Sequence, residues 1–129
     1  MISTRIPCKL ENDNYGRLAS YIADASHQGE KSLMSWCAGC WAGDDYELAM
    51  QEVADTQALN TRTTQPKTYH LVISFRPEDE SKLTPEVFKA IEERFAQALG
   101  LSEHQRHCGV HVNTENLHMH IAYNMFSIV

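Results

Sequence analysis

The C-terminal stretch HVNTENLHMHIAYN constrains the fold of this 129-residue chain more than any other segment. One apolar residue separates His118 from His120, so on a β-strand both imidazoles project from the same face. His111 lies just upstream, across the polar segment from Asn113 to Asn116, which suits a hairpin turn. If HCGVHV and LHMHIAYNM pair as antiparallel strands, His111 returns to the face of His118 and His120. The apolar residues that alternate from Leu117 to Met125 then face the core.

Three imidazoles on one face of a sheet suit a divalent transition metal, and three protein ligands leave coordination positions open for a substrate. We therefore interpret His111, His118 and His120 as ligands of a catalytic divalent metal, Mg, Mn or Zn. In the alternative interpretation, each is an ordinary hydrogen-bonded strand histidine.

Composition predicts one compact domain, because 129 residues with 43% hydrophobic content can bury a real core. No stretch reaches the length of a membrane span, and the N-terminus lacks the apolar run of a signal peptide, so we expect a cytoplasmic protein without a membrane segment. The formal charge of -6 argues against nonspecific binding to nucleic acid. Acidic residues gather in Asp44 to Asp55 and Glu86 to Glu93, whereas Asn60 to Lys67 carries Arg62 and Lys67 and no acid.

The four cysteines are too few and too scattered for a disulfide framework. Cys37 and Cys40 form a C-x-x-C, which is compatible with half a zinc site or a redox pair. No second C-x-x-C exists, and the run that contains Cys37, Trp36 and Trp41 resembles a strand. We therefore expect buried thiols without metal or lasting disulfide.

Local patterns predict the remaining elements. We expect further strands over Ile2–Ile6, Ser32–Ala42 and Tyr69–Phe75. Three helices are expected to begin after Asn12–Asn14, at a capping box of Asp44 and Glu47, and at Thr84 with Pro85. The last of these helices should end at Gly100. The first helix carries Tyr15, Leu18, Tyr21, Ile22 and Ala25 at helical spacing. The order predicts an α+β fold, an about five-stranded, largely antiparallel sheet packed against helices.

Three segments together resemble the signatures of the conjugative relaxases, the histidine-hydrophobic-histidine DNA-nicking enzymes of the mobilisation (MOB-P) class. His118-Met119-His120-Ile121 with the upstream His111 is similar to the third signature, and YHLVISF to the second, whose serine falls on Ser74. The helix LASYIAD resembles the first, whose nucleophilic tyrosine falls on Tyr21. The three follow the family order and cover nearly the whole chain.

The resemblance implies site- and strand-specific nicking and strand transfer at a plasmid or integrative-element transfer origin. It implies that Tyr21 forms a 5′-phosphotyrosine without ATP, that a divalent metal is the cofactor, and that Ser74 contacts a substrate phosphate. The expected partners are single-stranded transfer-origin DNA and accessory mobilisation proteins. Arg62, Lys67 and Arg76 are DNA-binding candidates.

Each assignment has an alternative. Tyr21 lies on the apolar stripe of its helix and is compatible with a core aromatic, and Tyr15 is the rival nucleophile. Ser74 is compatible with a satisfied strand hydroxyl, and the basic residues with solvated surface charges. Some family members carry an aspartate at Asn113, whose task would here pass to another group such as Glu78, Asp79 or Glu115.

Residues 1–129 are interpreted as a single relaxase-like nuclease domain, the core or a fragment of a longer family domain. Two other functions stay open: a noncatalytic DNA-binding relaxase remnant, and a histidine-metal protein unrelated to DNA. Formation of a covalent protein–DNA adduct separates the enzyme from both.

Overall fold

The computed structural model describes five stretches of the chain: residues 1–7, 13–23, 31–59, 66–113 and 116–127. In chain order, its elements are β1 (Ile2–Ile6), α1 (Tyr15–Ala23), β2 (Lys31–Ala38), α2 (Tyr46–Ala58), β3 (Thr68–Ser74), the 3-10 helix η3 (Pro77–Lys82), α3 (Pro85–Leu99), β4 (Arg106–Asn113) and β5 (Asn116–Asn124). Apart from the short η3, this is the order expected from the sequence. The predicted α+β class is confirmed.

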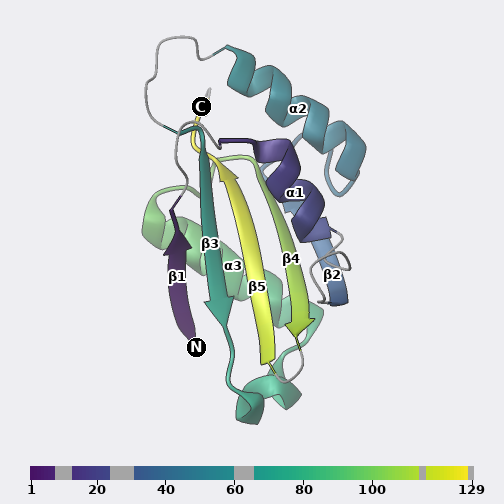
Figure 1. Ribbon diagram of the computed structural model, residues 1–129, viewed down its shortest axis with the longest axis vertical. Helices are drawn as coiled ribbons and strands as arrows, with labels where there is room; N and C mark the ends of the chain where they lie inside the picture. The colour runs from purple at the N-terminus through teal and green to yellow at the C-terminus, as the bar shows by residue number, and fades with distance from the viewer. Residues whose placement is uncertain (8–12, 24–30, 60–65, 114–115, 128–129) are drawn as a thin grey trace.

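The five strands form a single sheet in the order β1-β3-β5-β4-β2, and every neighbouring pair is antiparallel. The histidine hairpin, β4 and β5, therefore occupies the middle of the sheet (Figure 1). Side chains at the centre of a sheet are held by strands on both sides, so this is a rigid place for a functional site.

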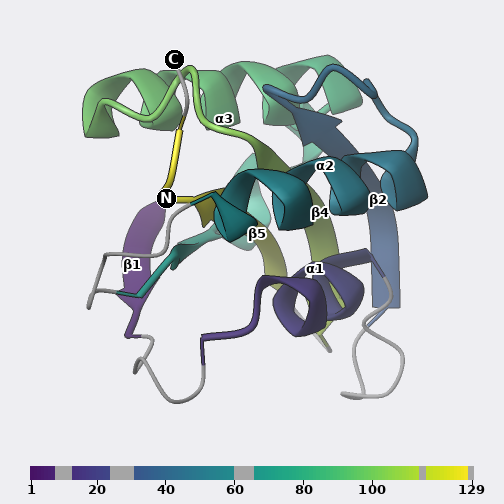
Figure 2. The same cartoon turned by 90° about the horizontal axis from the view of Figure 1, so that it is seen from above.

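Helices cover both faces of the sheet. Figure 2 shows α3 on one side and α1 on the other, and α2 packs against α1 and β2. The larger core cluster lies under α3, where Ile73, Met119 and Ile121 are fully buried. A smaller cluster under α1 joins Tyr15, Ala19, Ile22, Val53 and Ala122. Leu117, Met119, Ile121 and Tyr123 of β5 thus lie in the cluster under α3, as the alternation predicted. Met125 lies beyond the end of β5 and is 37% exposed, so its predicted place in the core is wrong.

Polar side chains mark the beginnings of the helices. The Asn14 side chain accepts from the Arg17 amide at 3.0 Å at the start of α1. Thr84 caps α3 by accepting from the Val87 amide, and Gly100 ends that helix in the left-handed region with φ of 74°. For α2 the predicted cap is wrong by one residue, because Asp45 and not Asp44 accepts from the Leu48 amide, at 3.1 Å.

The predicted strand Ser32–Ala42 is too long, since β2 ends at Ala38. Gly39 has φ of 70°, and a Cβ on it would lie 2.3 Å from the His104 carbonyl oxygen, so the chain turns there past a close backbone neighbour. Trp41 follows in this turn and is 96% exposed. Its placement in a strand is therefore also wrong, and the Glu52 carboxylate holds the turn by accepting from the Trp41 and Ala42 amides.

A buried ion cluster ties α3 to β4, and nothing in the periodicity of the sequence indicates it. Arg106, 1% exposed, donates to the carboxylates of Glu92 at 2.7 Å and Glu93 at 2.6 Å. Its Nη1 donates to the carbonyl oxygens of Ser102 and His104. A buried charge is tolerated only when it is paired and hydrogen-bonded in this way.

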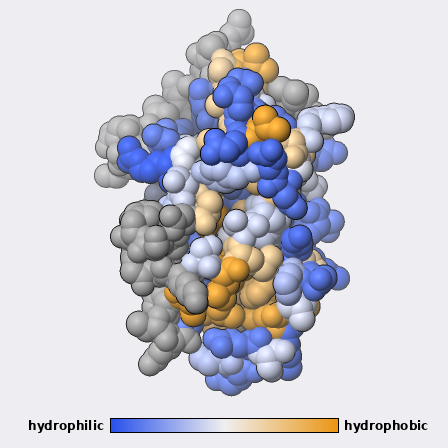
Figure 3. Space-filling model, turned by 90° about the vertical axis from the view of Figure 1, so that its right-hand side faces the viewer, coloured by the Kyte–Doolittle hydropathy of each residue, from blue (hydrophilic) through white to orange (hydrophobic). Residues whose placement is uncertain are grey.

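The surface beside β2 is mostly polar, with apolar atoms in limited patches (Figure 3). Across the stretches that the structure describes, every helix is too short or too polar to cross a membrane.

Candidate nuclease site

The strand register gathers the histidines that the sequence singled out. Ser74, His118, His111 and Ser32 are successive partners across β3, β5, β4 and β2, and so form one row of side chains. His120 is two residues beyond His118 on the same face, the face that α1 covers. The prediction that His111, His118 and His120 share one face is confirmed.

The imidazoles lie close together at graded depth. The ring centroids of His111 and His120 are 4.6 Å apart, and those of His118 and His120 are 6.5 Å apart. His111 is fully buried and His120 is 7% exposed, whereas His118 is partly exposed. These three imidazoles, the histidine row, therefore extend from the core beneath α1 toward solvent.

Tyr21 joins this cluster from α1. Its ring centroid is 5.1 Å from that of His111 and 5.3 Å from that of His120, with the planes nearly perpendicular in both pairs. The ring is partly buried at the margin of the smaller core cluster. A residue far away in the sequence thus packs edge to face against two of the three candidate metal ligands.

Tyr15, the rival nucleophile, is placed differently. It is 3% exposed, and its hydroxyl lies 2.7 Å from His107 Nδ1 and donates to the Ala122 carbonyl at 3.1 Å. Burial, followed by nearby cysteines, raises its pKa well above the ordinary value. Tyr15 is therefore a structural residue of the core, and of the two tyrosines only Tyr21 has a ring contact with the histidine row.

A fourth histidine belongs to the cluster. His70 on β3 lies with Nε2 3.0 Å from Nδ1 of His120, in a ring pair with a centroid distance of 5.3 Å. The sequence places His70 on the face of Ser74, but the spacing that signals a ligand set does not include it. An aspartate at position 113 would either orient a histidine or assist the tyrosine; in this structure the imidazole of His70 contacts His120.

The carboxylates considered for that task are engaged elsewhere or not described. Glu78 and Asp79 lie 3.7 and 3.5 Å from the Arg76 guanidinium in ion pairs, and Glu115 lies outside the described residues.

Burial lowers the pKa of two histidines of the cluster. It lowers the pKa of His120 to about 3, helped by the neighbouring His111, His70 and His118, and it lowers the pKa of His70 to about 4, helped by His111. Neutral imidazole is the form that binds a metal or accepts a proton.

The donor set therefore fits a divalent metal in its chemistry. Within the described ranges, however, no three or more His, Cys, Asp or Glu side chains stand together as a ready metal site. Two ring nitrogens are in hydrogen bonds, since His120 Nδ1 contacts His70 and His111 Nε2 contacts the Ile22 carbonyl at 2.8 Å.

The two basic DNA-binding candidates that the structure describes, Lys67 and Arg76, lie beyond opposite ends of β3. Lys67 precedes β3 at the end away from Ser74, and its ammonium donates to the Gln57 carbonyl at 3.2 Å. Arg76, with a side chain 71% exposed, follows Ser74 at the near end and pairs with Glu78 and Asp79. Arg62 lies outside the described residues.

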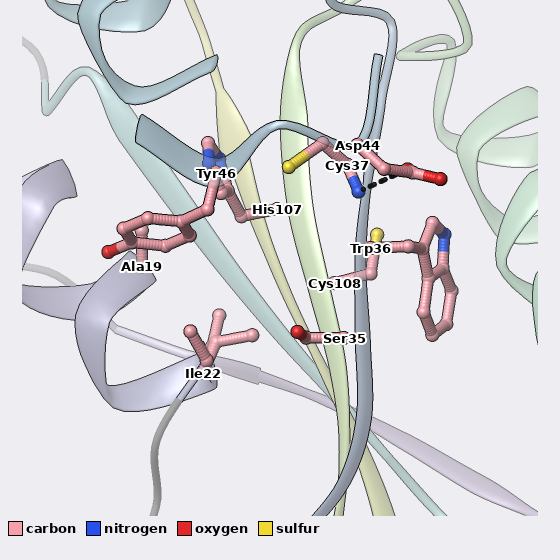
Figure 4. Close-up of a pocket in the computed structure, with 10 residues that line it drawn as sticks. Ala19, Ile22, Ser35, Trp36, Cys37, Asp44, Tyr46, His107 and Cys108 are labelled. Carbon is pink, nitrogen blue, oxygen red and sulfur yellow. Dashed lines mark hydrogen bonds between the residues drawn. The ribbon is translucent and has the colours of Figure 1, made fainter. Parts of the chain in front are cut away.

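Cys37, the first residue of the C-x-x-C, lines a small cavity of about 30 Å³ between α1, β2 and β4, together with Cys108 (Figure 4). Cys37, Cys40 and Cys108 are free thiols; Cys108 is buried, but Cys37 and Cys40 are only partly buried, so the prediction of full burial for these two is wrong. Burial and nearby negative groups raise the pKa of Cys37 to about 12 and that of Cys40 to about 11, so both are protonated at neutral pH. A protonated thiol is a poor metal ligand and a poor nucleophile.

We accordingly expect replacement of both Cys37 and Cys40 by serine to leave metal content and reaction with DNA unchanged. Metal analysis of the purified protein and a cleavage assay check this. Loss of bound zinc in the double variant would contradict it.

His107 also lines this cavity, and its burial should make the folded protein less stable in acid. It is 2% exposed, and burial lowers its pKa to about 4, against about 6.5 in an unfolded chain. Between these values the unfolded state binds more protons, so stability is full above about pH 6.5 and falls as the pH drops toward 4. The loss is at most about 1.4 kcal/mol per pH unit from this residue.

Urea unfolding of the wild type and of His107→Gln between pH 7 and pH 5 measures this effect. The variant is expected to show a shallower dependence on pH. Equal slopes would show that His107 does not contribute.

The structure thus combines a five-stranded antiparallel sheet, imidazoles in its central strands and a tyrosine packed against them. These features together define the class of protein. Residues 21–129 match the family described as Relaxase: MobA/VirD2-like, nuclease domain. The chain is a member of this relaxase family, which confirms the resemblance seen in the signatures.

Relatives agree with this assignment. Two proteins named Protein TraI from Escherichia coli are 40% and 38% identical to the chain over 125 residues, or 96% of it. The chain spans only 16% and 17% of their lengths. The fold is similar to a solved structure described as the MobM relaxase domain (MOBV; Mob_Pre) bound to a 26-nucleotide pMV158 oriT DNA. That match has a TM-score of 0.50 and 15% identity over 98% of this chain and 70% of the other.

Proposed function

We propose that this domain nicks one DNA strand at the transfer origin of a plasmid or integrative element and transfers the strand through a 5′-phosphotyrosine on Tyr21. The observation that carries the proposal is the packing of the Tyr21 ring against His111 and His120. Membership in the relaxase nuclease family and the transfer-origin DNA in the MobM structure support the choice of substrate.

The reaction needs no ATP, because one phosphate ester bond is exchanged for another. The Tyr21 oxygen attacks the scissile phosphorus, the new phosphotyrosyl bond replaces the broken phosphodiester bond, and the leaving oxygen becomes a free 3′-hydroxyl after taking up a proton. The phenol must lose its proton during attack, since a tyrosine hydroxyl is normally protonated at neutral pH. A later attack by a DNA 3′-hydroxyl reverses the step and releases Tyr21.

His111, His118 and His120 would hold the divalent cofactor, Mg, Mn or Zn. Bound there, the metal supplies charge stabilisation to the scissile phosphate. His70 positions His120 through their 3.0 Å contact. The partial exposure of His118 offers the solvent side of the row to an incoming phosphate.

Ser74 stands directly across from His118 in the strand register and is partly exposed. Its hydroxyl can donate to a phosphate oxygen next to the cluster. We propose Arg76, at the same end of β3, as a further phosphate contact, and Arg62 and Lys67 as contacts with more distant backbone. Single-stranded DNA is the expected substrate, and accessory mobilisation proteins are the expected partners.

The deciding experiment incubates the protein and Mn²⁺ with labelled single-stranded oligonucleotides spanning the transfer origin of the element that carries the gene. We expect a denaturation-resistant protein–DNA adduct and a shortened strand with a free 3′-end. Sequence-dependent binding without an adduct would select the noncatalytic remnant. Metal binding without any DNA binding would select a histidine-metal protein unrelated to DNA.

The metal assignment predicts that His118→Ala weakens Mn²⁺ binding by roughly tenfold or more, because one of three ligands is lost. Calorimetric titration of the metal into the protein measures this directly. His104→Ala is the matched control, since that imidazole contacts the Asn124 carbonyl at 2.7 Å instead. Equal losses in both variants would contradict the assignment.

A further inference from the structure

We propose that Gly109 and His111 of β4 form an anchor for the C-terminal turn of α1, and that this anchor positions Tyr21 for attack. The inference rests on the proposed role of Tyr21 as the nucleophile. Both residues act on the same atom, the carbonyl oxygen of Ile22, which is the residue directly after Tyr21.

Gly109 supplies the space. A Cβ added to it would lie 2.5 Å from the Ile22 carbonyl oxygen and 2.7 Å from the Ile22 side chain, closer than non-bonded atoms can approach. The glycine stands in the middle of β4, paired with Ser35 on one side and His120 on the other. A glycine inside a strand often marks the close approach of another backbone, and here that backbone belongs to α1.

His111 supplies the bond. Its Nε2 lies 2.8 Å from the Ile22 carbonyl oxygen. Because a carbonyl can only accept, Nε2 carries the proton, and in the neutral ring the lone pair lies on Nδ1. Ile22 belongs to the last turn of α1, where carbonyl oxygens have no partner within the helix. The histidine provides that partner.

The anchor matters because α1 cannot fix its own position. It has nine residues, and a helix of that length is marginal without tertiary contacts. Displacing the Ile22 carbonyl from Gly109 moves the adjacent Tyr21 away from His111 and His120. Misplacement of a reacting group by about 1 Å can cost roughly a hundredfold in rate. Gly109 is therefore a positioning residue.

Nitrogen NMR of the wild-type protein without metal tests the anchor independently of any activity. We expect His111 to be the tautomer with its proton on Nε2, and its ring protons to be shifted by the Tyr21 ring current. Tyr21→Leu should remove that shift, whereas Tyr21→Phe should keep it. A wild-type His111 with its proton on Nδ1 overturns the proposal, whatever any variant does.

Gly109→Ala tests the consequence for catalysis. At saturating single-stranded origin DNA, we expect the rate of adduct formation to fall roughly tenfold to a hundredfold, with DNA affinity unchanged and the His111 ring shift altered. Gly16→Ala is the matched control on the same helix, because a Cβ there meets its nearest atoms at 3.4 and 3.5 Å. It should react like the wild type.

A Gly109→Ala variant that is folded and reacts at the wild-type rate overturns the positioning role. Failure of the proposed function gives a different result. Either the wild type forms no adduct, or Tyr21→Phe forms the adduct as well as the wild type does, while the His111 tautomer stays as described. The tautomer and ring-shift measurements therefore decide the anchor even if Gly109→Ala does not fold.

Discussion

Tyr21→Phe should abolish the covalent protein–DNA adduct while the protein still folds and binds single-stranded origin DNA. The substitution keeps the ring that packs against His111 and His120 and removes only the oxygen that attacks. An interaction made only in the reaction step is lost from the rate and not from the affinity. Denaturing gel electrophoresis of the adduct and a binding titration on the same oligonucleotide measure the two quantities separately.

Tyr15→Phe is the control, because it removes a hydroxyl that is buried in hydrogen bonds with His107 and the Ala122 carbonyl. It should lower the free energy of unfolding by roughly 1 to 3 kcal/mol and still form the adduct. The opposite pattern, an inactive Tyr15→Phe and an active Tyr21→Phe, would show that Tyr15 and not Tyr21 is the nucleophile. If both variants form the adduct, neither hydroxyl is the nucleophile.

Arg106→Ala should lower the free energy of unfolding by roughly 3 to 5 kcal/mol, because it leaves the buried Glu92 carboxylate without its partner. Glu92 is 1% exposed, and burial already raises its pKa despite the opposing hydrogen bond from Arg106. Denaturant unfolding at pH 7 measures the loss. Arg106 faces α3, on the other side of the sheet from the histidine row, so this variant tests stability and not chemistry.

Two further variants show whether the lost ion pairing or the lost packing causes the destabilisation in Arg106→Ala. Glu93→Ala removes a half-exposed carboxylate at 2.6 Å from Arg106 and should cost about 1 kcal/mol or less. The double change Arg106→Met with Glu92→Leu replaces the buried pair by apolar side chains and should be far less damaging than Arg106→Ala. A double variant as unstable as Arg106→Ala would show that ion pairing is not what the single change removes.

Alternation and turn chemistry made much of the fold predictable. An alternating pattern fixes which side chains share a face, so the common face of His111, His118 and His120 followed from the sequence. Thr84 and Gly100 bounded α3 because their hydrogen bond and left-handed backbone are local features. The pairing of β3 with both β1 and β5 is long-range and has no local signal.

The parts that sequence missed depend on contacts between distant segments. His70 joined the cluster because β3 pairs with β5, and Arg106 became buried because α3 brings two carboxylates to it. Asp44 and Asp45 are equally good caps by residue type, and the position of the turn after Gly39 decides between them. The choice of Tyr21 over Tyr15 came from the relaxase resemblance, and the structure supports it by giving the Tyr15 hydroxyl a buried partner.

The central position of β5 gives the two sides of the proposed catalytic centre different mechanical character. His118 and His120 stand on a strand bonded along both edges, by β3 and β4, so they can move only if the whole sheet opens. Tyr21 stands on α1, a nine-residue helix that is held to the sheet by side-chain packing and by the His111 bond to the Ile22 carbonyl, without strand pairing, so its local opening costs less than opening of the sheet. For the proposed reaction, this difference lets Tyr21 move together with α1 while His118 and His120 keep their positions in the sheet.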